Sequence, residues 1–246
     1  MGSVIAILSG KGGTGKTTAC AGISIALSCA GAQVLCIDCD VGLRNLDIPL
    51  GIADGSALSF LDVSEGGYSL DEAFRHPDYP NLHFLTAPTN RRVEQIDDEA
   101  FRAMIRSARG KFDYILLDAP AGVEGGFRLA ASAADRFLIV TGSGPAAVRD
   151  ATRVGQLLEL AGKSDVRLLV NRVDKMMLSI LDQTIDDVMD AAGLPLIGVI
   201  LEDPDVPMAA ATGKSLLRYN KRSATVKSFQ RIAKRIQGYP EPIKIR

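Results

Sequence analysis

The sequence lacks any long apolar segment. No apolar run approaches the roughly 18–20 residues that a membrane-spanning helix needs, so an integral membrane protein is excluded as an interpretation. The first residues lead directly into a strand-like segment at Val4–Leu8, without the apolar leader typical of secreted proteins. We therefore predict a protein of the cytoplasm.

Histidine is scarce, because the chain has only His76 and His83. Neither lies near a cysteine cluster in the sequence, which argues against a zinc site. Neither stands beside a candidate nucleophile, and the G-x-S-x-G pattern of many serine hydrolases is absent. The glycine spacing also differs from that of a dinucleotide-binding fingerprint. The candidate functional residues are therefore lysines, carboxylates and glycines.

Cysteine is limited to four residues within one 20-residue stretch: Cys20, Cys29, Cys36 and Cys39. Disulfides are not expected in the cytoplasm. Cys36 and Cys39 form a CxxC pattern, which can indicate redox or metal chemistry. Gln33–Ile37 is typical of a strand, however, and its continuation would place these two thiols on opposite faces unless a turn begins directly after Asp38. We predict that Cys36 and Cys39 are buried thiols.

The net charge is small, at -1 over 246 residues, but the charges are unevenly distributed. Residues 1–206 carry 18 basic and 28 acidic side chains, whereas residues 207–246 carry ten basic side chains and one acidic side chain. A basic carboxyl-terminal end is typical of contact with an anionic partner, although a solvated helix face is the more common explanation.

Short apolar segments alternate with longer amphipathic ones. The predicted strands are Val4–Leu8, Gln33–Ile37, Leu82–Leu85, Tyr114–Asp118, Phe137–Thr141, Arg167–Val170 and Leu196–Ile200. The predicted helices are Thr17–Ala30, Asp97–Arg109, Gly125–Ala134, Ala146–Ala161, Leu178–Ala192 and Thr225–Gln237. Residues 51–81 are predicted to be a surface excursion with short helices. This alternation predicts an α/β fold with a doubly wound, mostly parallel sheet in one domain, residues 1–237, and a short tail, residues 238–246.

The strongest motif is a glycine-rich loop between the first strand and the first helix. Residues 10–17 read Gly-Lys-Gly-Gly-Thr-Gly-Lys-Thr and match the G-x-x-x-x-G-K-[ST] pattern in full. Such a loop wraps a phosphate with backbone N–H groups at a helix N-terminus, while Lys16 reaches the β- and γ-phosphates and the Thr17 hydroxyl binds Mg²⁺. The predicted phosphate-binding residues are Gly10, Lys11, Gly12, Gly13, Thr14, Gly15, Lys16, Thr17 and Thr18.

Three aspartates follow predicted strands. Asp38 and Asp40 come after the second strand, and Asp118 ends the apolar segment that begins at Tyr114. Because ligands bind at the carboxyl ends of parallel strands, these carboxylates are expected near the phosphates. One carboxylate can hold a metal-bound water, and another can orient the attacking water. We predict that Asp38 and Asp118 act on Mg²⁺ through water.

Lys11 is unusual, because an ordinary P-loop does not require a lysine at this position. The run Lys-Gly-Gly-x-Gly-Lys-Thr resembles the deviant Walker A motif of the MinD/ParA family of P-loop ATPases, and the similarity extends over residues 3–237. This resemblance implies an ATP-dependent homodimer in which ATP is sandwiched between the subunits. It also implies that Lys11 reaches the partner's nucleotide.

Two further segments resemble the family's switch regions. Residues 38–47, Asp-Cys-Asp-Val-Gly-Leu-Arg-Asn-Leu-Asp, are similar to switch I of the MinD branch. The resemblance implies that Asp40 positions the hydrolytic water and that Asn45 supports hydrolysis. Residues 118–122, Asp-Ala-Pro-Ala-Gly, are similar to switch II, which implies that Gly122 lies near the γ-phosphate.

The adenine base has two candidate walls. Asn171 and Arg172 follow a predicted strand, and an asparagine amide can donate to and accept from an adenine edge. The resemblance implies this use of Asn171. The turn that contains Pro204 and Val206 follows the last predicted strand and resembles the family's other adenine wall.

The MinD branch implies a slow, partner-stimulated ATPase that positions the division septum or a similar apparatus with partners of MinC and MinE type. Its members end in an amphipathic basic helix at the membrane interface. Here Thr225–Gln237 matches the family's last core helix instead, so we predict that it docks on the sheet. Residues 238–246 contain two prolines and cannot form the membrane helix, which leaves peripheral attachment at the inner face of the cell membrane open.

Two alternative functions also stay open. A ParA-like DNA-partitioning ATPase would use the basic carboxyl-terminal residues on DNA phosphates. An ATPase for cargo positioning or metal-centre maturation would depend on Cys36 and Cys39. The leading hypothesis is a MinD-like switch that dimerises with Mg-ATP and hydrolyses it.

Overall fold

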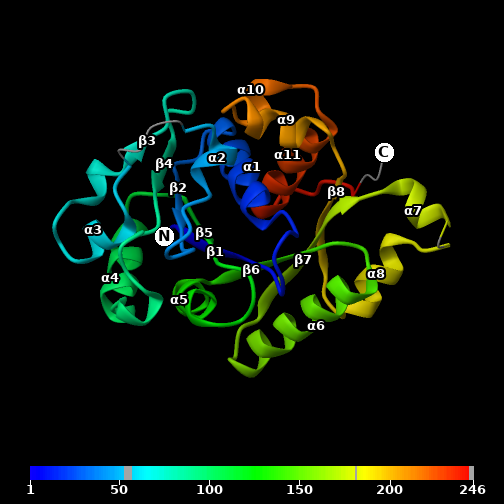
Figure 1. Cartoon of the computed structure of the whole chain (residues 1–246), viewed down its shortest axis with the longest axis horizontal. Coiled ribbons are helices and arrows are strands. Elements are labelled where there is room, and N and C mark those ends of the chain that lie inside the picture. The colour runs from blue at the N-terminus through cyan, green and yellow to red at the C-terminus, as the bar shows by residue number, and fades with distance from the viewer. Residues whose placement is uncertain (53–56, 181, 244–246) are drawn as a thin grey trace.

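The computed structural model describes residues 1–52, 57–180 and 182–243. Within these residues the strands form one sheet in the order β3-β4-β2-β5-β1-β6-β7-β8 (Figure 1). The strands are β1 Ser3–Leu8, β2 Val34–Asp38, β3 Phe74–Arg75, β4 Leu82–Leu85, β5 Tyr114–Asp118, β6 Arg136–Thr141, β7 Asp165–Val173 and β8 Leu196–Leu201. All neighbouring pairs are parallel except β3 with β4, so the predicted doubly wound sheet is confirmed.

Helices cover both faces of this sheet (Figure 1). The helices of the described residues are α1 Lys16–Cys29, α2 Asp47–Leu50, α3 Phe60–Ser64, α4 Asp98–Ala108, α5 Gly125–Ala133, α6 Pro145–Leu160, α7 Lys175–Ile180, α8 Ile185–Ala192, α9 Asp205–Ala211, α10 Leu216–Tyr219 and α11 Ala224–Ile236. Helices α4, α5, α6 and α8 pack on one face, and α1 and α11 pack on the other. Among the described helices, none is both long and apolar enough to cross a bilayer.

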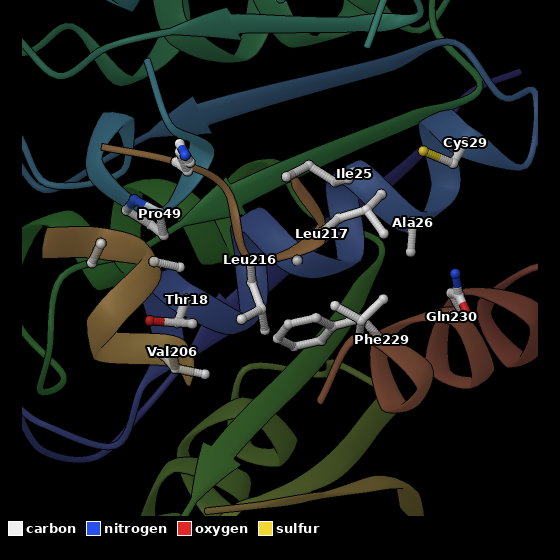
Figure 2. Close-up of a pocket in the computed structure, with 15 residues that line it drawn as sticks. Thr18, Ile25, Ala26, Cys29, Pro49, Val206, Leu216, Leu217, Phe229 and Gln230 are labelled. Atoms are coloured by element: carbon white, nitrogen blue, oxygen red, sulfur yellow. The ribbon is translucent and has the colours of Figure 1, made fainter. Parts of the chain in front are cut away.

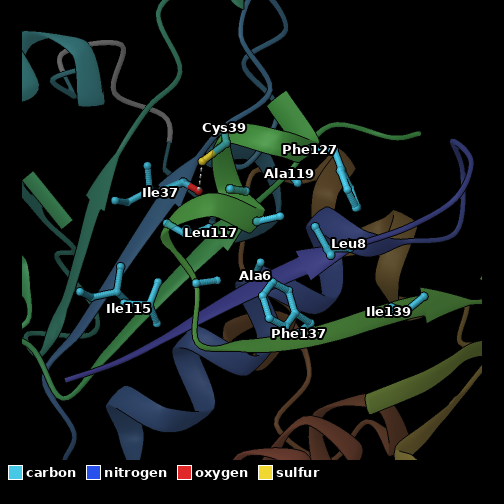
Figure 3. Close-up of a cluster of buried hydrophobic side chains, with 14 of the residues drawn as sticks. Ala6, Leu8, Ile37, Cys39, Ile115, Leu117, Ala119, Phe127, Phe137 and Ile139 are labelled. Atoms are coloured by element: carbon cyan, nitrogen blue, oxygen red, sulfur yellow. Dashed lines mark hydrogen bonds between the residues drawn. The ribbon is translucent and has the colours of Figure 1, made fainter. Parts of the chain in front are cut away.

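Successive residues of the central strands point into two different cores. In β1, Ala6 and Leu8 belong to the core under α4–α6, whereas Ile5 and Ile7 belong to the core under α1 and α11. Figure 3 shows the first of these cores, where Phe137 packs among neighbouring aliphatic side chains. Because both faces are buried, the strands are continuously apolar, as their sequence indicated.

Helix α1 packs on the sheet and closely against α11, which lies beside it on the same face. A Cβ atom added to Gly22 would lie 2.2 Å from the ring of Phe229, so only glycine permits this approach. Val226, Phe229 and Ile232 of α11 are each at most 4% exposed. The prediction that this amphipathic helix docks on the sheet is confirmed, because its apolar face is buried in the core.

The single helix predicted over Leu178–Ala192 is wrong, because the structure has two helices there, α7 and α8. Thr184 caps α8: its hydroxyl accepts the Asp187 N–H at 3.1 Å, and the Asp187 carboxylate accepts the Thr184 N–H at 2.7 Å. This capping box starts a new helix within a continuous periodic pattern. Residue 181, between the two, lies outside the described residues.

The excursion at residues 51–81 contains short elements, as predicted, although residues 53–56 of it lie outside the described residues. It holds α3, a 3₁₀ turn at Leu70–Glu72 and the two-residue strand β3. Sequence patterning did not predict β3, because two residues show no periodicity. The domain boundary at residue 237 stays a prediction, although α11 ends at Ile236.

The contact between α1 and α11 gives a stability prediction. Phe229→Ala should lower the free energy of unfolding by about 3–5 kcal/mol, because it removes a buried ring and leaves a cavity against Gly22. Urea denaturation at equilibrium measures this change. Lys227→Ala, an exposed position on the same helix, is the matched control and should change stability by less than about 0.5 kcal/mol. An equal loss in the two variants would contradict the packing described.

Candidate phosphate and metal site

The glycine-rich loop connects β1 to α1 and has a backbone that other residues adopt poorly. Gly13 and Gly15 have φ angles of 78° and 80°, in the left-handed region. A Cβ on Gly15 would also lie 2.3 Å from the side-chain nitrogen of Asn171. At Gly12 and Gly13 an added Cβ would meet no atom within 4 Å, so the concave side of the loop is open.

The residues present fit a phosphate group. The Thr14 side chain is 8% exposed, and its buried hydroxyl oxygen has no hydrogen-bond partner among the described residues. Buried polar atoms are normally paired, so this hydroxyl is suited to a bound acceptor such as a phosphate oxygen. Lys16, 7% exposed, begins α1 next to it and adds a positive charge.

Lys16 and Asp118 form a buried ion pair. The Lys16 Nζ lies 3.0 Å from an Asp118 Oδ, and the two side chains are 8% and 1% exposed. Burial raises the pKa of Asp118 above its usual value, and the charge of Lys16 and a hydrogen bond with the Thr17 side chain offset part of that rise. Thr17 and Asp118 thus place a hydroxyl and a carboxylate together, the oxygen ligands that Mg²⁺ prefers.

Asp38, the last residue of β2, is fully buried and pairs in register with Asp118 of β5. One of its oxygens accepts the Asp40 N–H at 2.9 Å. The other accepts the N–H groups of Asn45 and Leu46 at 3.0 and 3.1 Å. Burial and the neighbouring Asp118 raise the pKa of Asp38 to about 6, although these three donors oppose the rise. Its predicted role at the metal stays a prediction.

Asp40 and Asn45 lie on the loop that follows Asp38. Asp40 is half-buried, and burial raises the pKa of its carboxyl, while the charge of Lys16 opposes that rise. The charge of Asp40 also helps to raise the pKa of Asp118. The Asp40 carboxylate therefore lies within electrostatic range of the Lys16–Asp118 pair. Asn45 is exposed.

Gly122 joins the β5 end of the site to the glycine-rich loop. Its N–H donates to the Ser9 carbonyl at 3.1 Å, and its φ angle is 90°. The Ser9 hydroxyl in turn donates to the carbonyl of Lys11 at 3.0 Å. The sequence-predicted switch II glycine therefore lies beside the loop, and the exposed side chain of Lys11 extends from that loop.

Asn171 and Arg172 contact the loop itself, which the sequence did not predict. The Asn171 amide, 6% exposed, donates to the Thr14 carbonyl at 2.8 Å. Arg172 donates to the Gly13 carbonyl at 3.3 Å and to Glu202 at 2.9 Å. Arg172 has a φ angle of 55°, a strained conformation at an irregularity of β7. Their contact with adenine stays a prediction.

Pro204 and Val206 lie at the start of α9. Pro204 is the exposed N-cap residue, whereas Val206 is partly buried. Val206 lines an apolar cavity of about 50 Å³ between α1, α9, α10 and α11, together with Thr18 and Leu216 (Figure 2). The structure therefore brings Val206 next to Thr18, at the first turn of α1.

The four cysteines are free, and those of the CxxC pattern are separated by the sheet. Cys36 belongs to the core under α1, whereas Cys39 belongs to the opposite core, as predicted (Figure 3). Cys36 instead lies 3.6 Å from Cys20, sulfur to sulfur. Burial raises the pKa values of Cys20 and Cys39, so these thiols are poor nucleophiles and metal ligands.

Several known proteins resemble this chain over almost its whole length. It is 37% identical to the septum site-determining protein MinD of Synechocystis over 244 residues, 98% of this chain and 92% of that protein. It is 38% identical to MinD of Thermotoga maritima over 248 residues, 99% and 91% of the respective chains.

Solved structures agree with these relatives. The MinC:MinD cell division complex of Aquifex aeolicus matches with a TM-score of 0.90 and 34% identity, over 98% of each chain. MinD of Pyrococcus horikoshii complexed with Mg-ADP matches with a TM-score of 0.84 and 31% identity, over 96% of each chain. Residues 5–217 match the CobQ/CobB/MinD/ParA nucleotide binding domain. The chain therefore belongs to the CobQ/CobB/MinD/ParA family of nucleotide-binding proteins.

Proposed function

We propose that this protein is a MinD-like ATPase that binds and hydrolyses ATP with Mg²⁺ and serves to position the division septum. The observation that carries this proposal is the buried Lys16–Asp118 pair at the foot of a complete glycine-rich loop. Support comes from the near full-length relatives, which are septum site-determining proteins, and from the related MinD that was solved with Mg-ADP. ATP hydrolysis at a P-loop would not by itself specify septum positioning. That part of the proposal therefore rests on the relatives.

The nucleotide would be held by three groups of residues. The loop and first turn of α1, residues 10–18, would surround the phosphates, with Gly122 beside the γ-phosphate. The base would lie between Asn171 and Arg172 on one side and Pro204 and Val206 on the other. The bond from Asn171 to Thr14 supports this arrangement, because one residue then links the base wall to the phosphate loop.

Thr17 and Asp118 are the groups that we assign to Mg²⁺, with Asp118 acting through water. When bound, Mg²⁺ neutralises developing charge on the phosphates. Lys16 has to leave or share its contact with Asp118 to reach a γ-phosphate, and its flexible side chain permits this movement.

Asp40 is assigned to orient the attacking water, with Asn45 in support. Burial raises the pKa of Asp40 and the charge of Lys16 opposes that rise, so this carboxyl lies within electrostatic range of the phosphate end of the site. Turnover by the protein alone is expected to be slow, as the resemblance to the MinD branch implies.

Dimerisation would complete the site. Lys11 extends from the loop as an exposed side chain. In the proposed dimer it reaches the partner's nucleotide, which couples ATP binding to association. Partners of MinC type are proposed from the match to a MinC:MinD complex, and a MinE-type activator from the family resemblance.

We further propose a cytoplasmic protein that attaches peripherally to acidic membrane surfaces. Lys221, Arg222 and Lys227 are exposed at the α10–α11 end of the molecule. Basic side chains close to a membrane surface are attracted to anionic lipid at about 1 kcal/mol each. The same charges would serve the alternative, a DNA-partitioning ATPase.

Asp40→Asn should abolish partner-stimulated hydrolysis while ATP binding is retained, because the water is no longer oriented but the phosphate contacts remain. Phosphate release and equilibrium binding of ATP, measured in parallel, check both parts. Asp71→Asn, at an exposed aspartate outside the site, should behave as the unmodified protein. Normal turnover by Asp40→Asn would overturn the assigned role.

ATP should convert the protein from monomer to dimer, and Lys11→Ala should remain monomeric with ATP bound, since the contact across the interface is lost. Sedimentation velocity with and without ATP measures the change. Lys111→Ala, another exposed lysine, is the control and should dimerise. Dimerisation of Lys11→Ala to the normal extent would contradict the sandwich arrangement.

The ATP-bound protein should co-sediment with vesicles of acidic phospholipid and be released by about 0.5 M salt, because screening removes an electrostatic attraction. Neutralising Lys221, Arg222 and Lys227 together should reduce binding at least tenfold. Absence of vesicle binding, together with salt-sensitive retention of duplex DNA, would instead support the DNA-partitioning alternative.

A further inference from the structure

The loop that carries Asp40 and Asn45 has a specific anchor. Asp38 accepts the backbone N–H of Asp40 with one oxygen and the backbone N–H of Asn45 with the other. A third N–H, from Leu46, donates to the same oxygen as Asn45. Both oxygens are therefore engaged by the backbone of the two residues that are assigned to the attacking water.

Burial makes these contacts strong. Asp38 is 0% exposed, whereas Asn45 at the other end of the loop is exposed to solvent. Hydrogen bonds to an ionised carboxylate are worth roughly twice those between neutral groups, and a low local dielectric strengthens them further. Leu46, buried at 0% exposure, fixes the far end of the loop in the core next to this anchor.

Other contacts also hold the loop, among them the ion pair between Arg44 Nε and an Asp47 Oδ at 3.0 Å. The Gly42 N–H donates to the Pro88 carbonyl at 3.0 Å, and the Leu43 N–H donates to the Asp40 carbonyl at 3.0 Å. The second of these lies within the loop and moves with it. Asp38 is thus a side chain of the sheet that both ends of the loop contact.

We propose that Asp38 is a positioning residue for hydrolysis, which acts by fixing the backbone of Asp40 and Asn45. This assignment rests on the proposed ATPase function for its effect on rate. It differs from a metal-ligand role, because the loop's N–H groups occupy three of the roughly four acceptor positions of the carboxylate, which leaves at most one for a metal-bound water.

The first test is amide hydrogen exchange without nucleotide and with a chelator present, so that no metal contributes. In Asp38→Asn, the amides of residues 40–46 should exchange roughly tenfold faster, because the new side-chain NH₂ cannot accept an N–H and a charged acceptor is lost. Exchange in α6 should not change, which shows that the fold is retained. Unchanged exchange of residues 40–46 would overturn the proposal.

The second test separates positioning from metal binding. Asp38→Asn should lower kcat at least tenfold, while KM for ATP and the Mg²⁺ concentration for half-maximal rate change less than threefold. Asp118→Asn should raise that Mg²⁺ concentration at least tenfold. Asp97→Asn, which keeps its capping of α4, is the control for loss of one carboxylate and should resemble the unmodified protein. An equal rise in the Mg²⁺ requirement for Asp38→Asn would overturn the proposal.

The two tests distinguish failure of the proposed ATPase function from failure of the role assigned to Asp38. If the unmodified protein hydrolyses no ATP, the proposed function fails, while the exchange measurement still decides whether Asp38 anchors the loop. If Asp38→Asn does not fold, residue-resolved exchange in the unmodified protein decides instead. The amides of Asp40, Asn45 and Leu46 should then be protected, and rapid exchange at all three would overturn the proposal.

Discussion

A buried contact between an ammonium and a carboxylate is the interaction on which the site depends. Lys16 and Asp118 lie 3.0 Å apart with almost no exposure to solvent. Removing two such charges from water costs several kcal/mol for each ion, and their attraction offsets this only when further hydrogen bonds are present. Two apolar side chains would stabilise the fold at least as well. We infer that the pair is maintained for its chemistry, because it keeps a mobile cation beside a carboxylate suited to Mg²⁺.

The position of this pair depends on packing well away from it. Lys16 is the first residue of α1, so its location follows from how α1 lies on the sheet. That helix is fixed near its middle by the close approach of Gly22 to Phe229 of α11. Asp118 is placed by β5, which is paired on both sides with β1 and β2 and buried on both faces. The core therefore determines the distance between the two charges. Function at the carboxyl ends of the central strands depends on that distance.

The sequence permitted a good prediction of the sheet, the glycine-rich loop and the strand-end aspartates, because each depends on local pattern. Seven strands and the parallel topology follow from apolar runs that alternate with amphipathic ones. What the sequence could not predict were contacts between distant segments. The bond from Asn171 to the Thr14 carbonyl joins residues that are 157 positions apart. The break between α7 and α8 was missed because a capping box at Thr184 interrupts a pattern that remains periodic.

The site divides into a preformed part and an adjustable part. Asn171, Arg172 and Ser9 all contact the glycine-rich loop through its carbonyl oxygens, at Thr14, Gly13 and Lys11 respectively. Because these contacts use the carbonyl oxygens of the loop, its N–H donors are left to face an anion. Phosphate binding therefore needs little rearrangement. The loop from Asp40 to Leu46 is held differently, by its donors and by one carboxylate. That carboxylate is buried beside Asp118, its register partner on β5, so the anchor of the loop and the metal and phosphate site belong to one buried cluster of charges.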